Sequence, residues 1–208
     1  MKRLYLLRHG QTEFNVKKLV QGRCDSPLTD LGRQQARAAA AWLKAHGVVP
    51  DKVVSSPLGR AMDTAQLVAC ELIGPDAAVE PCKGIIERCY GTFEEGPHDA
   101  LPTDVWDPGE DLVPFGGEGS RALQERMVDT LTDIMGVEGI ETLLAVSHGS
   151  ASRQFIKAAA PEGFELPTKL PNCAIMIFDF EEAKPQAEGE PMQCKFTLQQ
   201  IVDPQQSN

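Results

Sequence analysis

The stretch LYLLRHGQTEFN, residues 4–15, decides the fold of the chain. Its first four residues form an uninterrupted apolar run, which is typical of a short strand buried on both faces of a parallel sheet. The run ends abruptly at Arg8 and His9, and Gly10 follows. A strand that ends in a guanidinium and an imidazole delivers both groups to the sheet edge where α/β proteins bind their ligands.

The rest of the chain alternates between strand and helix patterns. The expected strands cover residues 3–7, 53–54, 142–147, 173–180 and 194–202. The expected helices cover 29–46, 56–71, 118–135 and a stretch after 149. Thr29 is the expected N-cap of the first helix. This alternation favours a three-layer α/β/α fold with a mostly parallel central sheet, and 208 residues suffice for one domain, expected over 1–208.

Composition excludes several classes of function. The formal charge of −10 argues against attraction to nucleic acid or to an anionic membrane surface. The apolar run before Arg8 is too short for a signal peptide, and no run approaches the length of a membrane span. The six cysteines are scattered without a C-x-x-C pair, so we expect reduced thiols and no metal site. We therefore expect a cytoplasmic protein.

Residues 91–117 differ from the remainder of the chain. They are rich in glycine and proline and show no clean periodicity. Five acidic residues lie between Asp99 and Asp111, whereas Lys and Arg are absent between Arg88 and Arg121. Long irregular stretches inside a compact domain commonly cover or shape a functional site, so we expect a lid or specificity segment here.

Three expected strands end in residues that suit one chemistry. The first ends at Arg8 and His9, the second leads through Ser55 to Arg60, and the third leads into His148. Arginine offers planar, bidentate hydrogen bonds to phosphate oxygens. Imidazole can attack phosphorus or, when protonated, donate a hydrogen bond. The sequence therefore predicts a pocket for a tetrahedral oxyanion at this sheet edge.

Five blocks of sequence carry a resemblance to a known family. They are LLRHGQTEFN (6–15), DSPLTDLGRQQA (25–36), SSPLGRAMDTA (55–65), ERCYGTFEEG (87–96) and VSHG (146–149). In this order they resemble the histidine phosphatase superfamily, the phosphoglycerate mutase-like group. The resemblance implies a phosphoglycerate mutase-like α/β fold and phosphoryl transfer through a phosphohistidine. It extends from residue 3 to about 150 and implies neither a metal nor an organic cofactor.

The resemblance also assigns roles to individual residues. His9 matches the nucleophile, and Glu87 matches the carboxyl group that protonates the leaving oxygen and later accepts a proton from water. The phosphoryl oxygens would be held by Arg8, Arg60 and His148. Substrate contacts are expected from Asn15, Gln21, Gly22 and Gly149. Two positions depart from the family pattern: Gln11 stands where glutamate is common, and Gly119 is an extra glycine before Ser120.

Some of these residues also have ordinary structural explanations. Glu94, Glu95 or Asp99 could take the role assigned to Glu87, and Asn15 could simply cap a turn. His98 is interpreted as a loop histidine. Trp42, Trp106 and the methionines are interpreted as packing residues.

Three functions share this set of residues. A phosphatase lets water reach the phosphohistidine, whereas a cofactor-dependent phosphoglycerate mutase returns the phosphoryl group to a bound intermediate. The acidic 91–117 segment disfavours a second anionic group on the substrate, although Lys17, Lys18 and Arg23 could compensate. We therefore predict a phosphatase for small phosphate monoesters with a neutral or apolar leaving group. The third function, a non-catalytic phospho-ligand binder, would be expected to have lost the nucleophile or the acid. The sequence leaves the physiological substrate and the oligomeric state undetermined.

Overall fold

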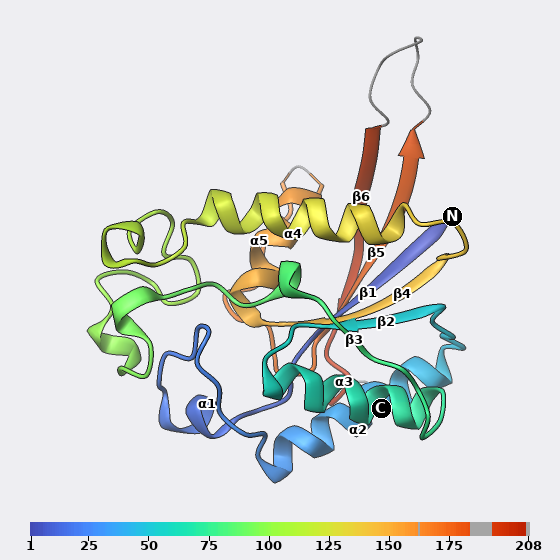
Figure 1. Ribbon diagram of the computed structural model, residues 1–208, viewed down its shortest axis with the longest axis horizontal. Coiled ribbons are helices and arrows are strands. Elements are labelled where there is room, and N and C mark those ends of the chain that lie inside the picture. Colours follow the sequence, from blue (N-terminus) through green and yellow to red (C-terminus); the bar gives the residue numbers. More distant parts are fainter. Residues whose placement is uncertain (162, 184–192, 207–208) are drawn as a thin grey trace.

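A six-stranded mixed sheet forms the centre of the protein. The computed structural model describes residues 1–161, 163–183 and 193–206, so the expected loop between the last two strands largely lies outside the described residues. The strands are β1 (Lys2–Arg8), β2 (Lys52–Ser55), β3 (Glu80–Pro81), β4 (Thr142–Ser147), β5 (Ile175–Ala183) and β6 (Gln193–Val202). Their order is β3-β2-β4-β1-β5-β6 (Figure 1). The first four are parallel, and β5 and β6 are antiparallel to their neighbours. The predicted mostly parallel α/β sheet is thus confirmed.

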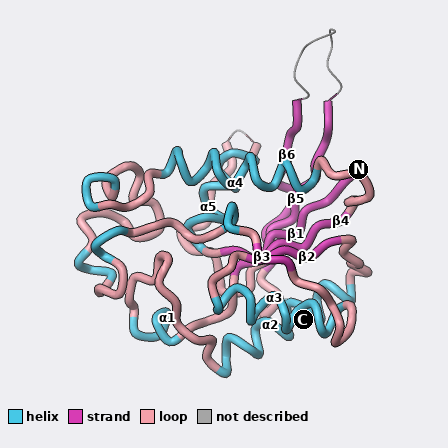
Figure 2. The backbone as a smooth tube through the Cα atoms, viewed as in Figure 1, coloured by secondary structure: helices cyan, strands magenta, loops and turns pink. Residues whose placement is uncertain are grey.

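Helices cover both faces of this sheet, which gives the three predicted layers (Figures 1 and 2). The five helices are α1 (Glu13–Lys17), α2 (Asp30–Ala45), α3 (Gly59–Leu72), α4 (Ser120–Met135) and α5 (Gly149–Ala159). Helices α2 and α3 lie on one face, and α4 and α5 lie on the other. Within the part of the chain described, none of the helices is both long and apolar enough to cross a bilayer. All six cysteines are free.

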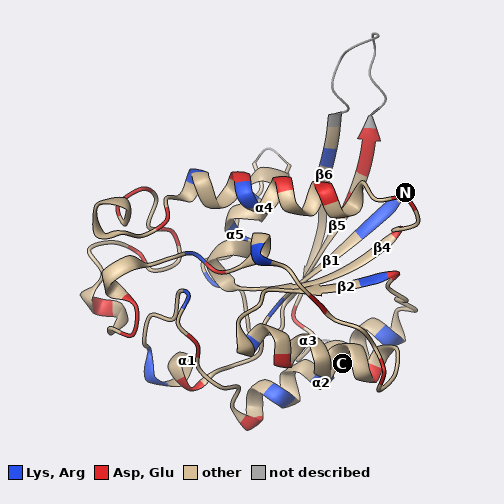
Figure 3. Cartoon of the chain, viewed as in Figure 1, with Lys and Arg blue, Asp and Glu red and all other residues tan. Residues whose placement is uncertain are grey.

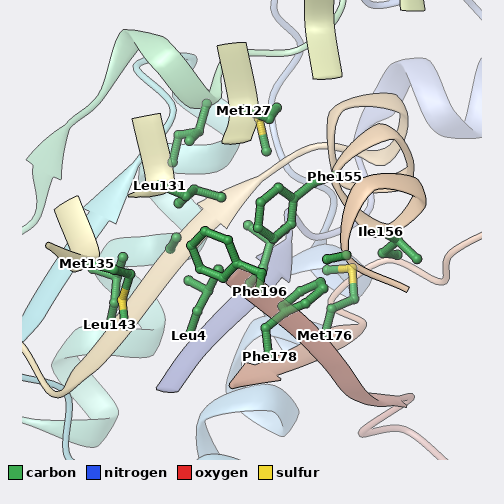
Figure 4. Packing of buried hydrophobic residues seen from close by; sticks show 14 of the residues in the cluster. Leu4, Met127, Leu131, Met135, Leu143, Phe155, Ile156, Met176, Phe178 and Phe196 are labelled. Atoms are coloured by element: carbon green, nitrogen blue, oxygen red, sulfur yellow. The ribbon is translucent and has the colours of Figure 1, made fainter. Parts of the chain in front are cut away.

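The side chains of β1 point alternately into two hydrophobic cores, one on each face of the sheet. Leu4 and Leu6 belong to the cluster under α4 and α5, whereas Tyr5 and Leu7 belong to the cluster under α2 and α3. Successive side chains of a strand point to opposite faces, so one short strand supplies both cores. Figure 4 shows the first cluster, where Phe155 of α5 contacts its neighbours edge to face. Its ring centroid lies 4.8 Å from that of Phe178 and 5.0 Å from that of Phe196.

Two helix starts differ from the sequence prediction. Thr29 does cap α2, because its hydroxyl accepts a hydrogen bond from the Gly32 N–H at 3.0 Å. Helix α3, however, begins at Gly59 rather than at Ser56, and α4 begins at Ser120 rather than at residue 118. Neither α3 nor α4 has a capping side chain at its own N-cap residue. Short helix α1 was not predicted at all.

The parallel pairing places three strand ends side by side. Arg8 of β1 pairs with Ser147 of β4, and Ser55 of β2 pairs with Val146 of β4. The residues that follow these strands therefore meet at one edge of the sheet, as predicted for ligand sites in parallel sheets.

Candidate active site

A small cavity of about 60 Å³ lies at this edge of the sheet. Such a volume has room for only a few water-sized groups. Eight of the nine predicted site residues line the cavity. The ninth, His148, does not, although its ring centroid lies 5.1 Å from that of His9. The lining residues are Arg8, His9, Asn15, Leu19, Val20, Gln21, Gly22, Arg60, Glu87, Tyr90, His98, Val105, Trp106, Gly149 and Ser150.

His9 follows β1 directly and is only 2% exposed. Its Nδ1 lies 2.7 Å from the Gly10 carbonyl oxygen, and since a carbonyl only accepts, Nδ1 carries the proton. The pKa of His9 is well below its usual range because of burial first, and then because of the nearby Arg60 and Arg8 guanidiniums. The imidazole is therefore neutral near pH 7, with the lone pair on Nε2 available for nucleophilic attack.

The backbone around His9 is fixed from both sides. The Gly10 N–H donates to the Thr64 hydroxyl at 3.1 Å, and the His9 carbonyl accepts from the Asn172 amide at 3.1 Å. A side chain at Gly10 would collide with the Gly32 carbonyl oxygen, since a Cβ there would lie 2.4 Å from it. Only glycine fits this contact, and it holds the turn after β1 against the start of α2.

Arg8 is buried beside His9. Its Nη1 donates to the Leu170 carbonyl, and its guanidinium carbon lies 5.1 Å from the centre of the Trp106 ring. Burial lowers the pKa of Arg8 to about 10, so the group remains a cation at neutral pH. Its Nε is buried and has no hydrogen-bond partner among the described residues. A buried cation with a free donor is costly unless a ligand pairs with it.

Arg60 lies in the first turn of α3 and is 1% exposed. Its Nη1 donates to the Cys24 carbonyl at 2.8 Å and to the Asp25 carboxylate at 3.0 Å. Its Nη2 donates to the Gly22 carbonyl at 2.8 Å, which draws the loop that carries Gln21 and Gly22 to the cavity. The Arg60 Nε, like that of Arg8, lacks a partner in the described part of the chain.

His148 is fully buried between β4 and α5. Its Nε2 lies 2.6 Å from the Ser56 hydroxyl, and its ring centroid lies 5.1 Å from that of His9. Burial, followed by Arg60, His9 and Arg8, holds the pKa of His148 well below its usual range. Its Nδ1 is a third buried polar atom for which the described residues supply no partner. Three such atoms close to one cavity fit a tetrahedral oxyanion with several oxygens to satisfy.

Glu87 also lines the cavity and is 8% exposed. One carboxylate oxygen accepts from the backbone N–H groups of Arg88 at 2.8 Å and Ala151 at 2.9 Å. The other accepts from the Ser150 N–H at 3.2 Å. Glu87 thus occupies the N-terminus of α5 and is oriented by backbone alone. The alternative carboxylates Glu94, Glu95 and Asp99 are not among the residues that line the cavity.

The expected substrate contacts have structural partners as well. The Asn15 side chain completes a capping box with Thr12 and also accepts from the Asn172 amide at 3.2 Å. Asn15 is thus both a cap and a cavity residue. The Gln21 side chain accepts from the Thr12 hydroxyl at 3.0 Å. Gly149 is required by close packing, because a Cβ there would lie 2.8 Å from the Trp106 ring.

Several residues at the site were not anticipated from sequence. Arg88 is fully buried and donates to the Ser150 hydroxyl, the Ser120 hydroxyl and the Glu118 carbonyl, so it braces the segment that carries Glu87. Trp106 and His98, interpreted as packing and loop residues, both line the cavity. Arg88 could have been found from its place next to Glu87 in the ERCYG block. No periodic signal marks Trp106.

The fold and this site define an α/β protein in which two buried arginines and a neutral imidazole meet at one cavity. The chain belongs to the histidine phosphatase superfamily (branch 1), whose family model matches residues 4–190. It is similar to the probable phosphoglycerate mutase GpmB of Enterobacter sp. (strain 638), with 31% identity over 196 residues, 91% of this chain and 90% of that protein. The predicted family is thereby confirmed.

Solved structures show the same relationship. A mutant phosphoserine phosphatase from Entamoeba histolytica in complex with phosphoserine is 28% identical, with a TM-score of 0.72 over 99% of this chain and 98% of that one. A phosphoserine phosphatase from the same organism in complex with 3-phosphoglyceric acid is 30% identical, with a TM-score of 0.67 over 86% of this chain and 91% of that one. Relatives named as mutases and as phosphatases thus share this fold.

Proposed function

We propose that the protein is a phosphatase that hydrolyses small phosphate monoesters through a phosphohistidine, with His9 as nucleophile and Glu87 as general acid and base. The observation that carries the proposal is the neutral, buried His9 surrounded by unpartnered polar atoms of Arg8, Arg60 and His148. Phosphoryl transfer needs mainly positioning and stabilisation of charge on three equatorial oxygens. These groups supply both.

The reaction would proceed in two steps. The Nε2 lone pair of His9 attacks phosphorus while the bond to the ester oxygen breaks, and protonated Glu87 donates its proton to the departing oxygen. The Glu87 carboxylate then accepts a proton from water as that water attacks the phosphohistidine, which releases inorganic phosphate and restores His9. A covalent intermediate divides one difficult displacement into two easier ones.

Charge near the cavity favours hydrolysis over isomerisation of phosphoglycerate. Segment 91–117 carries carboxylates but neither Lys nor Arg (Figure 3). Of the cations that could have bound a substrate carboxylate, Arg23 pairs with Glu118 at 3.5 Å and Lys17 pairs with Glu13 at 4.0 Å. Neither they nor the exposed Lys18 line the cavity. A second anionic group would thus lack a matched partner there.

The second candidate is a cofactor-dependent phosphoglycerate mutase, which the name of the GpmB relatives favours. Phosphorus NMR of the chelator-treated protein distinguishes the two. The sample contains 3-phosphoglycerate, an aryl phosphate and a trace of 2,3-bisphosphoglycerate. We expect inorganic phosphate, chiefly from the aryl ester, and no loss of rate with the chelator, because the charge stabilisation comes from Arg8 and Arg60. Formation of 2-phosphoglycerate with little free phosphate would instead establish a mutase.

The pH dependence of the reaction follows from the state of His9. Because its pKa is lowered, the imidazole stays neutral as the pH falls through 6.5, the usual value for histidine. The value of kcat/KM should therefore be maintained below pH 6.5 and should decline only at more acidic pH. The measurement is a profile of kcat/KM for an aryl phosphate, corrected for the second ionisation of the substrate. An acid limb centred at or above pH 6.5 would contradict a neutral, buried His9.

A further inference from the structure

Trp106 belongs to segment 91–117 and lies against both Arg8 and Gly149. Its ring lies 5.1 Å from the Arg8 guanidinium carbon and touches the backbone at Gly149, where a Cβ would lie 2.8 Å from the indole. The same ring lines the cavity. A cation over an indole face is attractive, so Trp106 both positions Arg8 and borders the space that a substrate would enter.

Three contacts hold Trp106 in place. The Tyr90 hydroxyl donates to the carbonyl of neighbouring Val105 at 2.7 Å. The backbone N–H of Trp106 donates to the Asp104 carboxylate at 2.8 Å. On the other side, the Asp107 carboxylate accepts from the Gln154 amide of α5 at 3.1 Å. A backbone fixed in this way leaves only the Trp106 side chain to be ordered when a ligand binds, which favours selectivity.

Asp107 makes two contacts with α5. Besides Gln154, it forms an ion pair with Lys157, one turn further along α5. Partial burial by itself would raise the pKa of Asp107, but the hydrogen bond and charge of Lys157 outweigh it and lower that pKa. The carboxylate is therefore ionised near neutral pH, and it ties the irregular segment to the helix that begins at Gly149.

The side chains that line the cavity differ in chemistry. Arg8, His9 and Arg60 lie at the cavity beyond the strand ends, where they would hold the phosphoryl group. The organic part of the ester must then lie against the remaining wall. That wall combines apolar and aromatic side chains, those of Leu19, Val20, Tyr90, Val105 and Trp106, with the polar side chains of Asn15, Gln21, Glu87, His98 and Ser150.

We propose that Trp106 is a specificity-determining residue of this site and that it selects phosphate monoesters with a flat, apolar leaving group such as an aryl ring. The inference rests on the proposed phosphatase function and adds the substrate class. Aromatic rings contribute attraction to each other beyond the area they bury. A leaving group without a ring would lose this attraction to the Trp106 side chain.

Kinetics on two esters test this proposal. We expect wild-type protein to show a higher kcat/KM for 1-naphthyl phosphate than for phosphoserine. Trp106→Leu should lower the ratio of the two values about tenfold, and Trp106→Phe should largely restore it. The matched control is Trp42→Phe, because Trp42 is also half-buried but stacks on His46 at a ring distance of 3.7 Å, outside the cavity. An unchanged ratio in Trp106→Leu would overturn the proposal.

Fluorescence supplies a second readout that does not depend on turnover. The chain has two tryptophans, so Trp42→Phe leaves Trp106 as the single indole. Its emission should change on saturation with phenylphosphonate. The protein should also bind phenylphosphonate more tightly than it binds methylphosphonate. Equal binding of both, or no change in emission, would contradict the proposed role of Trp106. If wild-type protein hydrolyses neither ester, the proposed phosphatase function is wrong, and the phosphonate titration still decides whether Trp106 recognises an aryl group.

Discussion

His9→Ala should lower kcat for an aryl phosphate about 10⁴-fold or more, since it removes the atom that would bond to phosphorus. Such a loss corresponds to at least about 5 kcal/mol of transition-state stabilisation. Neither Arg8 nor His148 can replace the nucleophile, because Arg8 has no lone pair to donate and the His148 Nε2 contacts Ser56. Acid-sensitive, base-stable phosphoprotein should be trapped from wild-type enzyme during turnover and be absent from the variant.

The variant should remain folded and should still bind phosphate. Loss of a buried imidazole costs on the order of 1–3 kcal/mol, which most domains tolerate. The unpartnered donors of Arg8 and Arg60 remain, so phosphate should bind with an affinity similar to that of wild type. His46→Ala is the matched control, since His46 is exposed and lies at the far end of α2. Residual activity above about one hundredth of wild type would remove His9 from the nucleophile role.

Much of this site could be predicted because it depends on strand ends. A buried strand is recognisable from a few apolar residues, and parallel neighbours bring their carboxyl ends to one edge. Arg8, His9 and His148 follow directly from that rule. Arg60 lies one helical turn beyond a third strand end, so its approach to the same cavity also follows from the topology. The capping role of Thr29 was predictable because its hydrogen bond is local and joins residues only three positions apart.

The starts of α3 and α4 could not be predicted, because contacts from distant loops decide them. Ser56 has the sequence of an N-cap, but its hydroxyl lies 2.6 Å from the His148 Nε2 and accepts only a long hydrogen bond, of 3.4 Å, from the Leu58 N–H. The Asp25 carboxylate accepts from the Gly59 N–H and caps α3 in its place. Likewise, Glu110 accepts from the Arg121 N–H at 3.0 Å at the start of α4. Sequence patterns describe local preferences, whereas these caps are supplied across 34 and 11 residues respectively.

Trp106 was misinterpreted for a related reason. Segment 91–117 contains only short 3₁₀ turns, namely Gly91–Phe93, His98–Ala100 and Val113–Phe115. Without periodicity, no pattern tells which side chains face inward. Its course is set by tertiary contacts, such as the Val20 N–H to the Gly96 carbonyl at 2.8 Å and the Asp107 contacts to α5. The segment was recognisable as functional from its composition, but its individual contacts were not.

Glu87→Gln should have an effect that depends on the leaving group. An alkoxide must be protonated as it departs, so kcat/KM for an alkyl phosphate such as phosphoserine should fall about 10²–10⁴-fold. An activated aryl phosphate such as p-nitrophenyl phosphate needs no proton for this step, so the rate of phosphoryl transfer from it to His9 should fall much less. Loss of the base should then slow attack by water, so the phosphohistidine should accumulate during turnover of the aryl ester.

This dependence separates chemistry from structure. Glu87 also accepts three backbone hydrogen bonds at the N-terminus of α5, and glutamine can reproduce only those made to its single oxygen. A merely structural defect would lower activity on both esters by the same factor and lower the thermal midpoint. The controls are Glu95→Gln and Asp99→Asn, which change exposed carboxylates outside the cavity lining. If either control showed the leaving-group dependence and Glu87→Gln did not, the acid would have to be reassigned to that residue. Phosphohistidine that reaches a higher level in Glu87→Gln than in wild type or in either control would instead establish that one carboxyl group serves both steps.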